Sequence, residues 1–253
     1  MIFLTSDIHG NIDIKKLNTK NFPEQKLLTK NDYLIINGDF GLLDKKIKLE
    51  KHYLDWLSNK NFTTLFLDGN HEDFNILNEY PTIEKFGGKV QEINPNIYHL
   101  MRGEIYTIEN KTFFIMGGAE SHDTSKLITM EEYKRHKRRY TKIGYDYEFV
   151  RVIGRDWFPQ EMPNINELEY GFKNLEKYNF KVDYILSHCA SNEIEDILGR
   201  KSPKLIKDNH ICDYFSMLEQ KVEYKHWYFG HYHQDINIDN KHTCIYNEKI
   251  KMD

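Results

Sequence analysis

The sequence predicts an α/β fold, and two observations lead to that prediction. Five short apolar runs have the length and composition of buried strands, and segments with helical periodicity lie between and after them. Each apolar run is followed by a polar motif that contains aspartate, asparagine or histidine. Ligands of α/β sheets bind at the carboxyl ends of the strands, so the second observation also predicts where a functional site lies.

Five strand-and-motif units follow one another along the chain. The predicted strands cover residues 2–4, 33–36, 64–67, 184–186 and 227–229. The motifs that follow them are Asp7-Ile8-His9, Gly38-Asp39-Phe40-Gly41, Gly69-Asn70-His71-Glu72, Ser187-His188 and Gly230-His231-Tyr232-His233. One such motif alone is typical of a turn or a helix cap, whereas five in succession favour a metal site.

The predicted helices are amphipathic and pack on the sheet. Two apolar stripes with helical spacing comprise Leu49, Tyr53, Trp56 and Leu57, and Ile211, Tyr214, Phe215 and Leu218. Asn166 and Glu169 predict a capping box at the start of another helix, and Glu72 and Asp73 are interpreted as favourable charges at a helix N-terminus. Turn residues at 239–241, between two strand-like segments, predict a hairpin.

Composition limits the class of protein. The chain has 253 residues, 40% of them hydrophobic, which is enough for one domain spanning residues 1–253. A formal charge of -4 at pH 7 argues against a general nucleic-acid coat or a membrane-surface protein. Three cysteines without a CxxC pair fit a reducing compartment. With no secretion signal and no apolar run of about 20 residues, we expect a cytoplasmic protein without membrane contact.

Residues 121–163 interrupt the pattern of strands and helices. Their periodicity weakens, their charge rises, and a basic run occupies residues 134–139. A long connection between strands is usually functional, so we interpret the segment as a charged insertion over the site within the single domain. For the basic run we prefer a solvated helix face, and contact with nucleotide or polynucleotide phosphates is the alternative.

The motifs supply a mixed set of metal donors. Asp7 and Asp39 offer carboxylates, Asn70 offers an amide oxygen, and histidines complete the set. Mixed carboxylate and imidazole donors suit manganese, iron, zinc, nickel or cobalt better than calcium or magnesium. Residues i and i+2 of an extended segment project to the same side, so His231 and His233 can both face one site.

The ordered set DxH, GDxG, GNHE, SH and GHxH, from Asp7 to His233, resembles the calcineurin-like metallophosphoesterase superfamily, and most of all its small single-domain bacterial and phage members. This resemblance implies a four-layer α/β/β/α sandwich of two mixed sheets flanked by helices. It also implies an enzyme, a metal-dependent phosphoric ester hydrolase in which a metal-bridging hydroxide attacks phosphorus.

The resemblance further implies two metal ions with a ligand set for each. Carried over by motif, the ligands of the first ion are Asp7, His9, Asp39 and His233, and those of the second are Asp39, Asn70, His188 and His231. Asp39 then bridges the ions. The catalytic residues are Asp39 and His71, the latter as a proton donor beside the metals. Manganese is the first expectation for both ions, with iron, zinc, nickel or cobalt as substitutes.

The expected substrate is a phosphomonoester or phosphodiester, either a small molecule or a nucleotide, and nucleic acid is a less favoured partner. Residues 117–123 resemble a turn of the family, which makes Gly118, Ser121 and His122 candidates for substrate contact. Arg102 could reach a phosphate oxygen, but we prefer a surface turn in which it pairs with Glu104. The alternative function is a catalytically silent metal-binding scaffold or interaction protein of the same fold, and a mononuclear metal sensor is a further rival.

Overall fold

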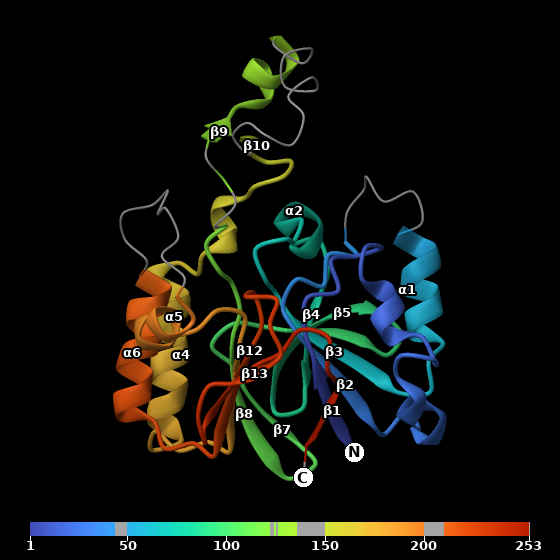
Figure 1. Ribbon diagram of the computed structural model, residues 1–253, viewed down its shortest axis with the longest axis vertical. Coiled ribbons are helices and arrows are strands. Elements are labelled where there is room, and N and C mark those ends of the chain that lie inside the picture. Colours follow the sequence, from blue (N-terminus) through green and yellow to red (C-terminus); the bar gives the residue numbers. More distant parts are fainter. Residues whose placement is uncertain (44–49, 122–123, 125, 136–149, 200–209, 253) are drawn as a thin grey trace.

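The computed structural model describes residues 1–43, 50–121, 124, 126–135, 150–199 and 210–252. Within these residues two large mixed sheets lie side by side, with helices on the outer face of each (Figure 1). This arrangement confirms the predicted α/β fold of two mixed sheets flanked by helices.

The first sheet has seven strands among the described residues, in the order β15-β1-β2-β3-β6-β5-β4. Its strands are β1 (Ile2–Thr5), β2 (Tyr33–Asn37), β3 (Thr63–Leu67), β4 (Thr82–Lys85), β5 (Gly88–Asn94), β6 (Ile97–Leu100) and β15 (Ile250–Met252). The neighbours β1, β2, β3 and β6 pair in parallel, and the remaining pairs are antiparallel. The parallel pairing aligns the carboxyl ends of β1, β2 and β3 along one edge.

The second sheet has six strands in the described part of the chain, in the order β13-β14-β12-β11-β8-β7. They are β7 (Ile105–Ile108), β8 (Lys111–Met116), β11 (Tyr184–Ser187), β12 (His226–Phe229), β13 (Ile236–Asn237) and β14 (His242–Cys244). The neighbours β8, β11, β12 and β14 pair in parallel, with β7 and β13 antiparallel at the edges. The antiparallel β13–β14 pair confirms the predicted C-terminal hairpin.

Successive side chains of the central strands enter different apolar layers, because side chains alternate along a strand. In β1, Leu4 packs in the layer that both sheets share, whereas Phe3 packs on the outer face of the first sheet. In β11, Leu186 joins the shared layer and Ile185 the layer between the second sheet and its helices. Both faces of both sheets are therefore covered, which explains why these strands are apolar throughout.

Helices cover the outer faces of the two sheets (Figure 1). The first sheet carries α1 (Glu50–Ser58) and the 3-10 helices η1 (Ile14–Leu17) and η2 (Pro23–Leu27), and the second carries α4 (Ile165–Lys177), α5 (Asn192–Ile197) and α6 (His210–Lys221). The predicted apolar stripe of α6 is buried at all of its positions. In the stripe on α1, Leu57 is buried, while Leu49 lies outside the described residues.

The start of α4 differs from the prediction. Its N-cap is Asn164, whose side chain accepts hydrogen bonds from the backbone N–H of Asn166 and Glu167, and the Glu167 side chain completes the capping box. The sequence contains two Asn-x-x-Glu patterns, two residues apart, and the prediction with Asn166 and Glu169 chose the later one. The helix extends back to the earlier pattern because Asn164 follows Pro163 in extended backbone and can cap it there.

Part of the segment 121–163 lies apart from both sheets. Strands β9 (Lys126–Ile128) and β10 (Val150–Val152) pair in parallel beyond the upper end of the sheets in Figure 1, and η3 (Pro159–Glu161) leads back to them. Of the basic run, Lys134 and Arg135 are described, and the exposed Arg135 pairs with Glu131 at 2.6 Å. Residues 136–139 lie outside the described residues. Among the helices of the described residues, none is both long and apolar enough to cross a membrane.

Candidate metal centre

The five polar motifs meet at one place. Loops that follow β1, β2 and β3 of the first sheet face loops that follow β11 and β12 of the second. Three overlapping groups, whose donor atoms lie within 4.8 Å of one another, contain Asp7, His9 and His233; His9, Asp39 and His71; and Asp7, Asp39 and His188. Among the described histidines and carboxylates, His231 is not in these groups, although its ring centroid lies 5.1 Å from that of His188.

Asp39 lies at the centre of the cluster and is buried. Its Oδ2 atom is 3.1 Å from Nε2 of His9, and its Oδ1 atom is 3.2 Å from Nε2 of His188. Oδ1 also accepts a hydrogen bond of 2.9 Å from the backbone N–H of His71. The two carboxylate oxygens thus face imidazoles from different sheets, which is the placement expected of a ligand shared by two cations.

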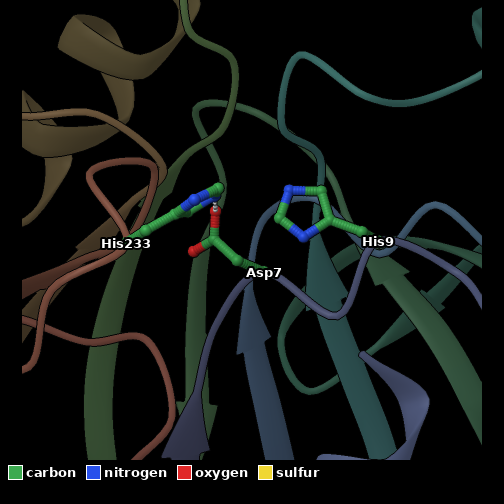
Figure 2. Close-up of side chains that lie close together, drawn as sticks. All are labelled: Asp7, His9 and His233. Atoms are coloured by element: carbon green, nitrogen blue, oxygen red, sulfur yellow. Dashed lines mark ion pairs between the residues drawn. The ribbon is translucent and has the colours of Figure 1, made fainter. Parts of the chain in front are cut away.

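Asp7 and His233 form the more open side of the cluster. Figure 2 shows the Asp7 carboxylate directed at the ring of His233, with His9 on the opposite side. Oδ1 of Asp7 lies 3.4 Å from Nε2 of His233, and the carboxylate accepts hydrogen bonds from the backbone N–H of His231 at 3.1 and 3.3 Å. Asp7 is fully buried, whereas the His233 side chain is 44% exposed, so the site reaches solvent beside His233.

Hydrogen bonds at Nδ1 orient two of the imidazoles. Nδ1 of His188 lies 2.8 Å from the backbone carbonyl oxygen of Asn37, and Nδ1 of His9 lies 3.2 Å from Oδ2 of Asp13. Because these partners only accept, each Nδ1 carries a proton and donates it. Nε2 of each ring then faces Asp39 and is the atom left to bind a cation, and a neighbour that holds Nδ1 in this way is usual for metal-binding histidines.

The cluster attracts positive charge. Burial would raise the pKa of Asp39, but the charges of His188 and His71 outweigh it and hold that pKa well below its usual range. Burial likewise would lower the pKa of His188, but Asp39 outweighs it and raises the pKa to about 10. In the metal-free chain His188 therefore carries an extra proton beside Asp39, where the motifs predict a cation.

Two buried atoms fit the predicted cations. Oδ1 of Asn70 and Nε2 of His188 are both buried and make no hydrogen bond. Nε2 of His188 lies 3.2 Å from Asp39, so the missing interaction is one of geometry rather than of distance. Buried polar atoms are almost always satisfied, and a divalent cation would satisfy both of these. The donor set present therefore fits metal ions at this place.

The backbone at the ligands is unusual. Asp7, His9, Asp39, His231 and His233 all adopt positive φ angles, between 43° and 68°. This left-handed region is uncommon for residues other than glycine and costs about 1 kcal/mol or more at each. Each of these predicted ligands lies in a loop that follows β1, β2 or β12. Such strain is typical of functional sites.

Gly69 allows the closest approach within the cluster. A Cβ atom at this residue would lie 2.1 Å from Oδ1 of Asp39 and 2.7 Å from Nε2 of His188. The loop that carries Asn70 therefore packs directly against the carboxylate of Asp39, and only glycine leaves that space. The requirement explains why the glycine of the GNHE motif precedes Asn70.

Glu72 has a role that its sequence position did not predict. It is buried, and its carboxylate accepts hydrogen bonds from the backbone N–H groups of Phe40 at 2.7 Å and Gly41 at 3.0 Å. Burial and the charge of Asp39 raise the pKa of Glu72 to about 8. It thus ties the loop of Asp39 to the loop of Asn70, while Asp73 alone caps α2 (Phe74–Leu77), as expected for a helix N-terminus.

Arg102 is not in a surface turn, and that interpretation is wrong. Arg102 is buried and donates from Nε to Oδ2 of Asp68 at 2.8 Å, with Nη2 at 2.5 Å from the same atom. Glu104 bonds instead to the hydroxyl of Tyr170 at 2.6 Å. The motif gave no sign of Asp68, which lies 34 residues away and is brought beside Arg102 by the parallel pairing of β3 with β6.

The other candidates for substrate contact lie near Asp68 and Asn70. The backbone N–H of Gly118 donates to the carbonyl of Asp68 at 2.9 Å. The hydroxyl of Ser121 lies 3.3 Å from Nδ2 of Asn70. Both residues therefore support the loop of Asn70, and contact with substrate stays a prediction. His122 lies outside the described residues.

Comparison with known proteins points to one family. Residues 1–235 match the family model described as calcineurin-like phosphoesterase. The chain is 27% identical over 180 residues to the lariat debranching enzyme of Schizosaccharomyces pombe, an alignment that covers 66% of this chain and 33% of that protein. The chain therefore spans about a third of the length of this curated relative.

Among solved structures, phosphopantetheinyl hydrolase (PptH) from Mycobacterium tuberculosis superposes with a TM-score of 0.42 at 14% identity, over 97% of this chain and 89% of that one. The family match covers most of the chain, including every motif of the cluster. The protein belongs to the calcineurin-like phosphoesterase family.

Proposed function

We propose that this protein hydrolyses phosphate esters with two divalent transition-metal ions bound at the cluster around Asp39. The observation that carries the proposal is the position of Asp39, with one oxygen 3.1 Å from His9 and the other 3.2 Å from His188. Nε2 of each imidazole faces an oxygen of Asp39, so the arrangement favours positive charge on both sides of the Asp39 carboxylate.

The proposed ligand sets follow the motifs. The first ion would be held by Asp7, His9, Asp39 and His233, and the second by Asp39, Asn70, His188 and His231. When bound, two such ions supply Lewis-acid charge and lower the pKa of a water molecule toward 7, so that it can attack phosphorus at neutral pH. Manganese is our first choice for both positions, because the set mixes carboxylate, amide and imidazole donors.

The residues of the chain contribute position and proton transfer. Asp13 and the carbonyl of Asn37 hold the rings of His9 and His188, so that neither ligand has to be ordered during turnover. The ring of His71 lies 5.4 Å from that of His9, at the partly exposed rim of the cluster. There it can donate a proton to the leaving oxygen of a substrate.

The substrate class is proposed at the level of the ester. The relative named lariat debranching enzyme makes a nucleotide diester the first diester to test beside an aryl phosphate monoester. We also propose that residues 1–253 form one domain, since the cluster joins Asp7 to His231 across nearly the whole chain.

The test compares wild type with Asp39→Asn for metal content and hydrolysis. Apo protein is loaded separately with manganese, nickel, zinc and iron, and bound metal is counted by elemental analysis beside rates on both ester classes. We expect two ions per wild-type chain and loss of both ions and turnover in Asp39→Asn. Asp55→Asn, at an exposed position that pairs with Lys51, serves as the control and should match wild type.

Three outcomes would contradict the proposal. Full turnover by Asp39→Asn would remove the bridging role, and a single tightly bound ion in wild type would favour a mononuclear site. Two bound ions without hydrolysis of any ester would favour the silent scaffold of the same fold.

A further inference from the structure

The side chain of Asn70 can serve a metal ion in only one of its two orientations. A carboxamide has an oxygen that can bind a cation and an NH2 group that cannot. In the structure Oδ1 of Asn70 is buried without a hydrogen-bond partner, and Nδ2 lies 3.3 Å from Oγ of Ser121. A group that fixes which end of the Asn70 carboxamide faces Ser121 therefore also fixes which end faces the metal cluster.

The hydroxyl of Ser121 has one proton, and that proton is already engaged. Oγ of Ser121 donates to Oε2 of Glu161 at 2.6 Å, and the backbone N–H of Ser121 donates to Oε1 at 2.9 Å. With its proton used, Oγ can only accept from Asn70. The end of Asn70 that faces Ser121 must therefore be the NH2 group, and the oxygen must point the other way.

Glu161 is well placed to impose this polarity. It is 1% exposed, and the side chains of Ser121 and Trp157 both make hydrogen bonds to its carboxylate. Because the indole of Trp157 can only donate and Ser121 donates twice, the carboxylate acts as acceptor throughout. A hydrogen bond to an ionised carboxylate is stronger than one between neutral groups.

The backbone of Glu161 is also fixed. Its carbonyl oxygen accepts hydrogen bonds from the N–H of Ala119 at 3.1 Å and from Nη2 of Arg102 at 3.3 Å. Arg102 in turn binds Asp68, which lies two residues before Asn70. The backbone of Glu161 is therefore tied through Arg102 to the segment that carries Asp68 and Asn70, which keeps its side chain within reach of Ser121.

We propose that Glu161, acting through Ser121, is a positioning residue that sets the orientation of the Asn70 carboxamide and directs its oxygen at the second metal ion. The inference rests on the proposed two-metal function and deepens it. It also gives the two ends of the segment 121–163, which supply Ser121 and Glu161, a defined part in building the metal centre.

Glu161→Gln tests the polarity because it keeps the shape of the side chain and changes its donors. One of the two accepting oxygens becomes an NH2 group. If that group faces Oγ of Ser121, the hydroxyl proton turns toward Asn70 and favours the flipped carboxamide, with NH2 toward the ion. If it faces the backbone N–H of Ser121 instead, the NH2 group and the N–H are both donors, so their hydrogen bond is lost. Ser121→Ala removes the connection without reversing it, so its effect should be smaller.

The experiment measures manganese binding to the full-length apo protein at pH 8 by calorimetry, with elemental analysis of stoichiometry. In Glu161→Gln we expect the second ion to bind about 10- to 100-fold more weakly, the range usual for loss of a group that orients a ligand, and the first ion to bind as in wild type. Glu104→Gln, which changes a buried carboxylate bonded to Tyr170, is the control and should leave both affinities unchanged.

A second background separates orientation from general structural damage. In Asn70→Asp both ends of the side chain are oxygens, so its orientation no longer matters. Adding Glu161→Gln to Asn70→Asp should then cause no further loss of affinity for the second ion. An equal loss in both backgrounds would overturn the proposal, and so would wild-type affinity in Glu161→Gln. A wild-type chain that binds fewer than two ions would refute the proposed function itself, and this inference with it.

Discussion

The sharpest steric prediction concerns Gly69→Ala. The added methyl carbon would lie 2.1 Å from Oδ1 of Asp39, 2.5 Å from the backbone N of Asp39 and 2.7 Å from Nε2 of His188. The shortest of these distances is about 1.3 Å less than the 3.4 Å at which ordinary van der Waals contact begins. The neighbours are held in place, because Nδ1 of His188 donates to the carbonyl of Asn37 and Oδ1 of Asp39 accepts from the backbone N–H of His71.

The magnitude follows from what must move. Relief of the overlap requires a shift of about 1 Å in Asp39, in His188 or in the loop of Asn70. Overpacking of this kind costs about 1 to 3 kcal/mol of stability, and a ligand misplaced by about 1 Å can cost about 100-fold in rate. We therefore expect Gly69→Ala to fold, with a lower melting temperature, to bind metal poorly and to lose at least about 100-fold in hydrolysis.

The assay pairs thermal unfolding with metal stoichiometry and rate. Gly87→Ala is a matched control, since Gly87 has a φ of +84° and open space around the position of Cβ. It should lose about 1 kcal/mol from backbone strain alone while keeping its metal and its activity. Gly69→Ala protein that binds two ions with wild-type affinity would refute the steric argument.

Three further predictions concern charge and proton transfer. Arg102→Met leaves Asp68 buried without its guanidinium partner, so denaturant unfolding should show a loss of about 3 to 5 kcal/mol, and a loss below about 1 kcal/mol would show that the pair is dispensable. His71→Gln should retain its bound metal while turnover of an aryl phosphate falls about 100-fold or more; loss of metal together with turnover would make His71 a ligand. Burial raises the pKa of Glu161 from 4.5 to about 7, so the folded chain binds a proton that the unfolded chain releases between these values. The metal-free wild type should therefore lose about 3 kcal/mol of stability relative to Glu161→Gln as the pH rises from 4.5 to 7, and parallel pH profiles of unfolding for the two proteins would contradict this.

The strands and the meeting of their motifs could be predicted because both signals are local. Apolar runs such as residues 33–36 have no polar face to expose, which predicts buried strands. A polar residue directly after such a strand lies at the carboxyl end of the sheet. The parallel order of β1, β2 and β3 then brings Asp7, Asp39 and Asn70 together.

The residues that orient the ligands could not be found in the same way. Glu161 reaches Ser121 across 40 residues, and Arg102 reaches Asp68 across 34. Neither contact leaves a periodic trace in the sequence, since it depends on how two segments fold back on each other. Asp13 is nearer, four residues after His9, but a lone aspartate in a turn has many ordinary uses.

The hydrogen bond from His231 to Asp7 joins residues 224 positions apart in the chain. During synthesis, strands β1 to β6 of the first sheet can pair before this bond is possible, whereas β15 joins that sheet only afterwards. The proposed metal centre can therefore be complete only after β12 has been made and has paired in the second sheet, since His231 and His233 follow it. A shortened chain that ends before β12 would therefore keep Asp7, His9, Asp39 and His188 but lack the backbone N–H of His231 that binds Asp7.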